Sequence, residues 1–187
     1  YKDEVAYNYD GKILGIFEAK ALAYLLTGDA SYGYEAIIGI KNAMLTLNYT
    51  EDIAQDTYHG ASHVMVNVAK VYDWCYDLLT AEDKVQFIAG VENCLCRGSN
   101  QAGSKTEYGF PPTGGRSVSG HGSEYIILRD YLSFAIAIYG DNNSWWNYIG
   151  GRVYNEFIPV RNYYYQSDMT PQGTGIYVTA RFGADIF

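Results

Sequence analysis

Two short stretches of the chain carry side chains whose types and spacing suit acid–base chemistry. In the first, residues 119–125 (SGHGSEY), His121 lies between two glycines and Glu124 follows three residues later. A near-neutral imidazole can act as a base or a hydrogen-bond donor, and glycine permits the close approach of a ligand. Helix capping by Ser119 or Ser123 would explain the serines and Glu124. It would not explain the two glycines around His121.

The second stretch, residues 169–181 (MTPQGTGIYVTAR), places two glycines before Tyr177 and an arginine, Arg181, four residues after it. On a helix, residues four apart share a face. A free tyrosine has a pKa of about 10, so it becomes a useful base only when a cation stabilises its phenolate. Arg181 is a candidate for that cation. A buried tyrosine beside a surface arginine is the plainer alternative, because the chain contains 20 tyrosines.

Neither histidines nor cysteines form a convincing metal-binding pattern. His59 and His63 have the i, i+4 spacing of zinc sites,. However, Gly60 stands where a catalytic acid would be expected, and no third ligand is evident, so we expect no metal. An odd number of cysteines gives no disulfide framework, and we expect these thiols to be small, buried apolar side chains. The cysteines are Cys75, Cys94 and Cys96.

The overall composition limits the classes of partner. A chain of 187 residues is long enough for one domain with its own core,. The net charge of −8 argues against nucleic acid as a partner,, but a local basic groove could still bind an acidic sugar. No apolar run reaches the roughly 20 residues of a membrane span. The sequence begins with YKDEV and stops within a predicted helix, so we interpret it as a fragment.

Helical periodicity dominates the chain and predicts an all-α domain over residues 1–187. No strand alternation or hairpin signal is convincing. Thr80 and Asp83 form a helix-capping signature,. Helical pairs without a strict repeat fit an α-solenoid or an α/α toroid, and the lack of an exact repeat favours the toroid. We predict helices over 11–26, 32–47, 59–79, 80–96, 123–139 and 145–164, the last interrupted near Pro159, and another from about 176, with polar loops at 98–122 and 166–175.

Several further side chains could contact an acidic sugar, although a packing or surface role is the plainer expectation for each. Guanidinium groups form bidentate contacts with carboxylates and sulfates, amides could bind sugar hydroxyls, and aromatic rings could stack on sugar rings. The arginines are Arg116, Arg129, Arg152 and Arg161, the amides Asn100 and Gln101, and the aromatic residues Trp145, Trp146 and the tyrosines at 163–165.

Taken together, the motifs resemble those of the heparinase II/III-like polysaccharide lyases. The resemblance is carried by HGSEY at 121–125, about 50 residues of mostly helical sequence, and QGTGIYVTAR at 172–181. The run VYDWCYDLLTAEDK at 71–84 is also similar to a helical hairpin of that family. The resemblance extends over most of the chain.

This resemblance implies an α/α toroid followed by a β-sandwich, and cleavage of uronic-acid polysaccharides by β-elimination. It identifies His121 with the toroid histidine, Glu124 with the acid beside it and Tyr177 with the catalytic tyrosine. The family's further histidine and its structural metal lie in the β-sandwich, so we expect no cofactor in this chain. The resemblance also implies a bacterial periplasmic or secreted protein. Candidate substrate-binding residues are Arg181, Arg116, Asn100, Gln101 and Gln172.

Two other functional classes remain open at this point. α/α toroids also support glycoside hydrolases, which use two carboxylates spaced for attack by water, and Glu124 with Asp168 could be that pair. Alternatively, the chain could be a non-catalytic helical module that binds glycans through its tyrosines. Loss of activity on removing a carboxylate would indicate a hydrolase, whereas loss on removing the Tyr177 hydroxyl would indicate a lyase.

Overall fold

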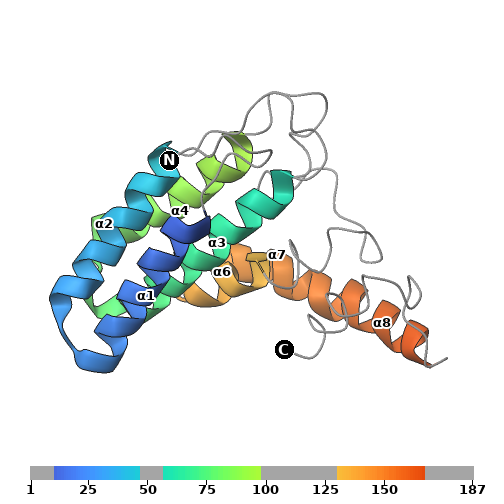
Figure 1. The fold of residues 1–187 in the computed structure, drawn as a ribbon. Helices are drawn as coiled ribbons and strands as arrows, with labels where there is room; N and C mark the ends of the chain where they lie inside the picture. The colour runs from blue at the N-terminus through green and yellow to red at the C-terminus, as the bar shows by residue number, and fades with distance from the viewer. Residues whose placement is uncertain (1–10, 47–56, 98–129, 167–187) are drawn as a thin grey trace. The chain divides into compact units, whose positions relative to one another are not determined.

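The structure is a computed structural model that describes residues 11–46, 57–97 and 130–166. All regular secondary structure in these three ranges is helical, and none of their residues lies in a strand. The predicted all-α class is therefore confirmed (Figure 1). The described helices belong to two compact units, divided between Gly115 and Arg116. The assignment of residues 1–187 to one domain stays a prediction.

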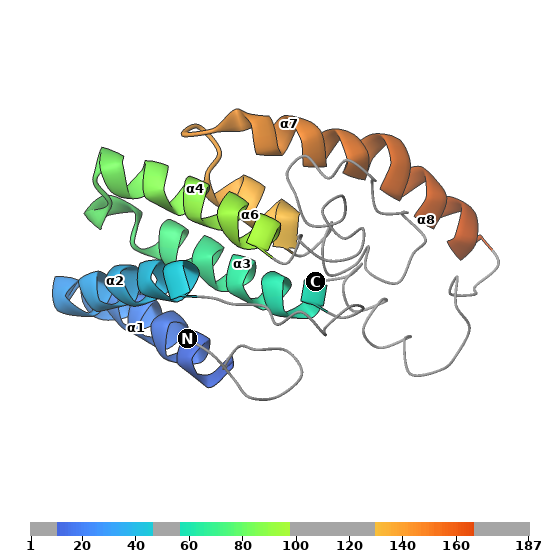
Figure 2. The same ribbon diagram turned by 90° about the horizontal axis from the view of Figure 1, so that it is seen from above.

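Among the residues that the structure describes, the first unit has four long helices that pack as neighbouring pairs. α1 (Gly11–Thr27) packs against α2 (Ala30–Thr46) and α3 (Thr57–Trp74), and α2 also packs against α4 (Ala81–Arg97). Figure 2 shows these four helices running alongside one another. The observed bounds of α1, α2 and α4 lie within two residues of the predicted ones, because each is a long run with strong helical periodicity,.

The turn between α1 and α2 is set by two residues. Gly28 has a φ of 74°, a left-handed conformation that glycine adopts easily, and its N–H donates to the Tyr24 carbonyl at 2.8 Å,. Asp29 then caps α2, because its Oδ1 accepts from the Ser31 N–H at 2.9 Å and from Ser31 Oγ at 2.8 Å,. This cap explains why α2 begins at Ala30, two residues before the predicted start.

Side chains from all four helices fill the core of the first unit. Tyr72 and Phe87, both fully buried, meet edge to face with ring centroids 5.6 Å apart and link α3 to α4,. On the other side of α2, Gly39 lies so close to α1 that a Cβ atom there would overlap the Phe17 ring. Other buried apolar residues of this core are Leu14, Ala21, Ala36, Ile37, Ile40, Val64, Val68, Val71 and Val91.

The predicted helix over 59–79 ends earlier than expected. α3 stops at Trp74, and a 3₁₀ turn, η1 (Tyr76–Leu78), follows. Its i to i+3 bonds run from the Leu78 N–H to the Cys75 carbonyl at 2.9 Å and from the Leu79 N–H to the Tyr76 carbonyl at 3.1 Å,. The turn brings Leu78 against Gly33 of α2, where any Cβ atom would overlap Leu78 Cδ1. A tertiary contact therefore accompanies the end of this helix.

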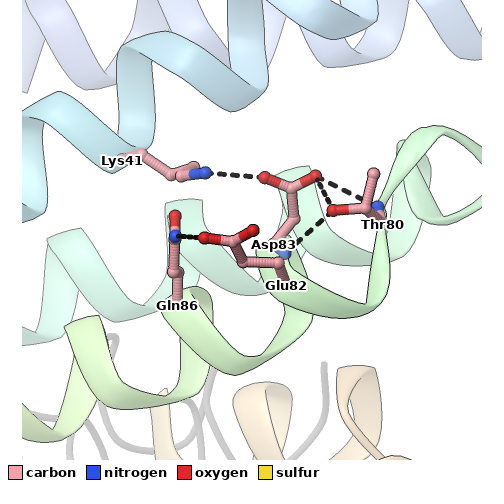
Figure 3. A network of polar contacts seen from close by, with 5 residues as sticks. All are labelled: Lys41, Thr80, Glu82, Asp83 and Gln86. Atoms are coloured by element: carbon pink, nitrogen blue, oxygen red, sulfur yellow. Dashed lines mark hydrogen bonds and ion pairs between the residues drawn. The ribbon is translucent and has the colours of Figure 1, made fainter.

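The capping signature at the start of α4 is confirmed and extends to a neighbouring helix (Figure 3). Thr80 Oγ1 accepts from the Asp83 N–H at 3.1 Å, while Asp83 Oδ2 accepts from the Thr80 N–H at 3.0 Å and from its hydroxyl at 2.6 Å,. The second carboxylate oxygen, Oδ1, accepts from Lys41 Nζ of α2 at 2.6 Å. One carboxylate thus caps its own helix and binds α4 to α2.

In the described part of the second unit, α6 and α7 pack around one buried tryptophan. A π-helical turn at Asp130 and Tyr131 leads into α6 (Leu132–Ala137), and Asn142 caps α7 (Asn143–Arg152) by accepting from the Ser144 N–H at 3.0 Å. Trp145 is fully buried. Its ring centroid lies 5.3 Å from that of Tyr131 and 4.9 Å from that of Phe134, both edge to face. These contacts hold α6 against α7.

The predicted interruption near Pro159 takes the form of a π-helical segment. η4 (Val153–Phe157) connects α7 to α8 (Ile158–Tyr165) in one continuous helical ribbon (Figure 2). The Ile158 N–H donates to the Val153 carbonyl, five residues back. Because Pro159 has no N–H, it cannot continue the i to i+4 bonding. The wider π turn directly before the proline lets the helix run on without a break.

Candidate functional site

The predicted acid–base residues lie outside the described residues. His121 and Glu124 belong to the stretch 98–129, and Tyr177 belongs to the stretch 167–187. The alternative hydrolase partner, Asp168, lies in the second stretch as well. The same holds for the candidate substrate-binding residues Arg181, Arg116, Asn100, Gln101 and Gln172, and for Arg129. All of these assignments stay predictions.

The described helices of the second unit lie between the two motifs in the sequence. Asp130 comes six positions after Glu124, and α8 ends at Tyr165, twelve positions before Tyr177. Both predicted catalytic stretches are therefore joined by short lengths of chain to α6, α7 and α8. These helices are the described elements that lie nearest in sequence to the two motifs.

Asp130 is the residue of this region that sequence reasoning missed. Its side chain is fully buried, directly after the stretch that carries His121. Burying a carboxylate is costly unless partners compensate its charge, and Asp130 is one of the few buried polar side chains among the described residues. The residue pair Arg129-Asp130 inside an apolar helical run gave no indication of this, because such pairs commonly lie on the solvent face of a helix.

The candidate stacking residues have different surroundings. Trp145 is fully buried among aromatic rings and cannot stack on a sugar, so its plain packing role is confirmed. Trp146 is partly exposed, and its ring centroid lies 5.8 Å from that of Tyr139, which is itself 62% exposed. This pair presents aromatic surface to solvent. Tyr163 is more exposed still, at 73%.

Arg152, one of the candidate sulfate-binding arginines, already has an anionic partner. Its Nε and Nη2 donate to Glu156 Oε2 at 3.1 and 2.9 Å. Burial acts to lower the pKa of Arg152, but hydrogen bonds with Glu156 and Tyr148 outweigh it and raise the pKa overall,. These contacts fix the guanidinium across the junction of α7 and η4. The structure thus supports the packing role for Arg152.

Arg161 of α8 is also part of the helical packing. It is only 7% exposed, and its guanidinium carbon lies 4.5 Å from the centroid of the Phe157 ring. A buried guanidinium over an aromatic face is a cation–π contact. Burial keeps Arg161 away from a polymer that approaches from solvent.

The described part of the chain contains no group of three or more His, Cys, Asp or Glu side chains that could hold a metal ion. His59 and His63 lie four positions apart on α3, but the description does not extend to their side chains or to those of Cys94 and Cys96. Cys75 is free and fully buried. Burial raises the pKa of its thiol to about 11. Because the thiolate is the reactive form, this cysteine is unreactive at neutral pH.

Among the described helices, none is long and apolar enough to cross a membrane. Comparison with protein families finds no family model that matches the chain. Comparison with characterised proteins finds no relative that matches it either. The functional assignment therefore depends on the residues themselves.

Proposed function

We propose that this chain is part of a polysaccharide lyase that cleaves a uronic-acid-containing glycan, such as a heparan-type polysaccharide, by β-elimination. The observation that carries the proposal is the pair of motifs at 121–125 and 172–181. Each places a residue capable of proton transfer next to glycines, His121 in the first and Tyr177 in the second. The proposed arrangement of the helices is an α/α toroid, and the proposed location is the bacterial periplasm or the exterior of the cell.

The reaction needs the functional groups that these two motifs supply. A base removes the proton from the carbon next to the uronate carboxylate, the electron pair forms a carbon–carbon double bond, and the glycosidic C–O bond breaks. An acid then returns a proton to the leaving oxygen. The developing negative charge on the carboxylate must be stabilised by hydrogen-bond donors or cations.

Each motif residue has a proposed role in these steps. Tyr177, with Arg181 to stabilise its phenolate, removes the proton and can return it to the leaving oxygen when both lie on the same side of the sugar. His121 neutralises the uronate carboxylate or acts as the base from the opposite side. Glu124 orients the imidazole of His121. The glycines on either side of His121 leave room for the sugar chain to approach.

The remaining candidates would bind the polymer on either side of the reacting sugar. Guanidinium groups recognise carboxylates and sulfates through paired hydrogen bonds, and amides bind hydroxyls. The proposed binding residues are Arg116, Asn100, Gln101 and Gln172. The all-α fold and the packing of α1 to α4 as neighbouring pairs support a scaffold of helical hairpins.

The test is to incubate the protein with a panel of uronic-acid polysaccharides and to follow the ultraviolet absorbance of the unsaturated uronate. We expect absorbance to rise with at least one substrate. We expect Tyr177→Phe and His121→Ala each to lower the rate by at least about 100-fold. Tyr34→Phe is the matched control, because Tyr34 lies half-exposed on α2 of the first unit, and it should leave the rate unchanged.

The product distinguishes the proposal from its alternatives. New reducing ends without absorbance, together with inactivity of Asp168→Asn and activity of Tyr177→Phe, would indicate a hydrolase. Binding of a polysaccharide without any product would indicate a glycan-binding module. Either result would contradict the roles proposed for Tyr177 and His121.

A further inference from the structure

The helix α1 is apolar on almost every side, including the side that its neighbours leave exposed. Its sequence, GKILGIFEAKALAYLLT, contains only three charged residues. A helix that is apolar all round is normally buried all round. The packing against α2 and α3 covers only part of it. The remaining side therefore needs a partner or is an unusual exposed apolar surface.

The two charged residues in the middle of α1 point toward its own neighbours. Glu18 Oε1 accepts from Lys70 Nζ of α3 at 2.6 Å. Lys20 pairs with Glu35 of α2. These ion pairs mark the two edges where α1 meets α3 and α2. The surface between those edges carries no charge over the three turns from Gly15 to Leu26.

We define the outer face of α1 by four residues that lie within about 60° of one another at 100° per residue. All four are exposed, with Leu22 at 40% and Leu26 at 75%. The other two, Gly15 and Ala19, are small, and a Cβ atom at Gly15 would meet nothing within 4 Å. The outer face thus has small residues toward the start of α1 and large residues toward its end. Its residues are Gly15, Ala19, Leu22 and Leu26.

From this pattern we infer that the outer face of α1 binds a second copy of the same chain, with the two α1 helices antiparallel across a two-fold axis. In this register the large half of one copy meets the small half of the other. Leu26 faces Gly15 of the second copy, and Leu22 faces Ala19. Each leucine fills the space above a small residue, which lets the helices approach closely and removes apolar surface from water. A two-fold interface requires such self-complementarity.

Charges at the two ends of the helix agree with the same register. Lys12 lies on the outer side of α1, three residues before Gly15, and Asp29 lies three residues after Leu26. Both are exposed. In the antiparallel pair, Lys12 of each copy comes next to Asp29 of the other. The parallel arrangement would instead bring like charges together, which opposes association.

The oligomeric state of the chain tests this inference directly. Sedimentation equilibrium of the 187-residue chain under reducing conditions, from about 1 to 200 μM, should reveal a monomer–dimer equilibrium,. We expect Leu26→Glu to raise the dimer dissociation constant by about 30-fold or more. Leu45→Glu is the matched control, because Leu45 is a similarly exposed leucine on α2, at 69%. It should change the constant by no more than about 2-fold.

A second variant distinguishes packing in the proposed register from non-specific association of apolar surfaces. Gly15→Leu adds apolar surface where the chain itself leaves space, so it should fold normally and even favour the helix,. In the proposed register the introduced side chain would collide with Leu26 of the other copy, and we expect the dimer to weaken by about 10-fold or more. Stronger association in Gly15→Leu would overturn the register.

Two further results would overturn the inference altogether. A monomer at every concentration would mean that another segment of the chain or a different protein covers the outer face. A dimer that is unaffected by Leu26→Glu would mean that the copies associate through some other surface.

Discussion

The two units are held together in different ways. Among the described residues of the first unit, three ion pairs join helices that are distant in the sequence: Lys20–Glu35, Glu18–Lys70 and Lys41–Asp83. In the second unit, Arg152 pairs with Glu156 only four residues along the same helical run. In the described part of this unit, the buried Trp145 packs α6 against α7. The described ion pairs thus join separate helices in the first unit and stay within one helical run in the second, while buried aromatic rings join helices in both.

This difference determines how each unit should respond to mutation. Ion pairs at partly exposed positions contribute little individually. A large buried ring contributes several kcal/mol at a single position. Each unit should therefore be more sensitive to the loss of a buried ring than to the loss of an ion pair. The predicted catalytic stretches are connected in sequence to this second unit, so its integrity matters most for the proposed activity.

Trp145→Ala should have the largest effect. Removing a fully buried ring leaves a cavity between α6 and α7, and we expect the free energy of unfolding of the second unit to fall by about 3–5 kcal/mol,. Denaturation by urea, followed by near-ultraviolet circular dichroism, measures the change. Trp146→Ala, which removes a partly exposed ring, should cost less than half as much. Equal effects of the two variants would contradict the central role of Trp145.

Gly39→Ala should have the next largest effect, in the first unit. Alanine normally favours a helix over glycine by about 1 kcal/mol. Here its methyl group would overlap the Phe17 ring of α1, so we expect a net loss of about 1–3 kcal/mol. Gly15→Ala is the control, because a Cβ atom there meets nothing within 4 Å. It should raise stability by up to about 1 kcal/mol, and a stabilising Gly39→Ala would show that α1 and α2 are not packed so closely.

The interhelix contact of Asp83 should make stability depend on pH. A hydrogen bond from Lys41, with others from Thr80, lowers the pKa of Asp83 from 3.8 to about 2. A lowered pKa stabilises the fold above pH 3.8, and this contribution is lost as the pH falls from 3.8 to about 2,. We expect this contribution to the free energy of unfolding to be about 1 kcal/mol, because solvent partly screens the Lys41–Asp83 pair.

The corresponding measurement compares the wild-type chain with Asp83→Asn in thermal or urea denaturation. Asparagine retains an oxygen that can cap α4, so the variant removes mainly the charge. We expect it to be less stable than the wild type at about pH 6 and nearly as stable at about pH 2. The same difference at both pH values would mean that the Lys41–Asp83 pair makes no contribution through charge.

Local signals in the sequence were sufficient to predict the all-α class and most of the described helix boundaries. The threonine and acid of the α4 cap lie three residues apart, so their contact needs no information from elsewhere in the chain. Pro159 likewise marks the helix interruption by its own chemistry. The end of α3 could not be predicted in this way, because the 3₁₀ turn packs Leu78 against Gly33, 45 positions earlier.

The candidate site also shows what residue types can predict and what they cannot. Residue types and motif spacing were enough to select His121 and Tyr177 as a hypothesis, because proton-transfer chemistry depends on side-chain type. They could not reveal which neighbouring side chains are buried. Residue types did not single out Asp130, and for Arg161 they left sulfate binding open beside the plainer packing role. Both residues are buried in the structure. Burial depends on which helix faces meet, and that is a property of the whole fold.

Glu156→Gln should have the smallest effect and completes the comparison between the units. Glu156 is half-exposed and bonds to Arg152 within one helical run, and pairs four residues apart on a helix contribute about 0.3–0.5 kcal/mol. The loss should therefore be smaller than that for Asp83→Asn at the same pH, and should decrease in about 1 M salt as screening increases. Urea denaturation of both variants side by side gives the ratio of their losses in unfolding free energy. A larger loss for Glu156→Gln would mean that the π segment η4 depends on its ion pair, and that the second unit too is stabilised by charge.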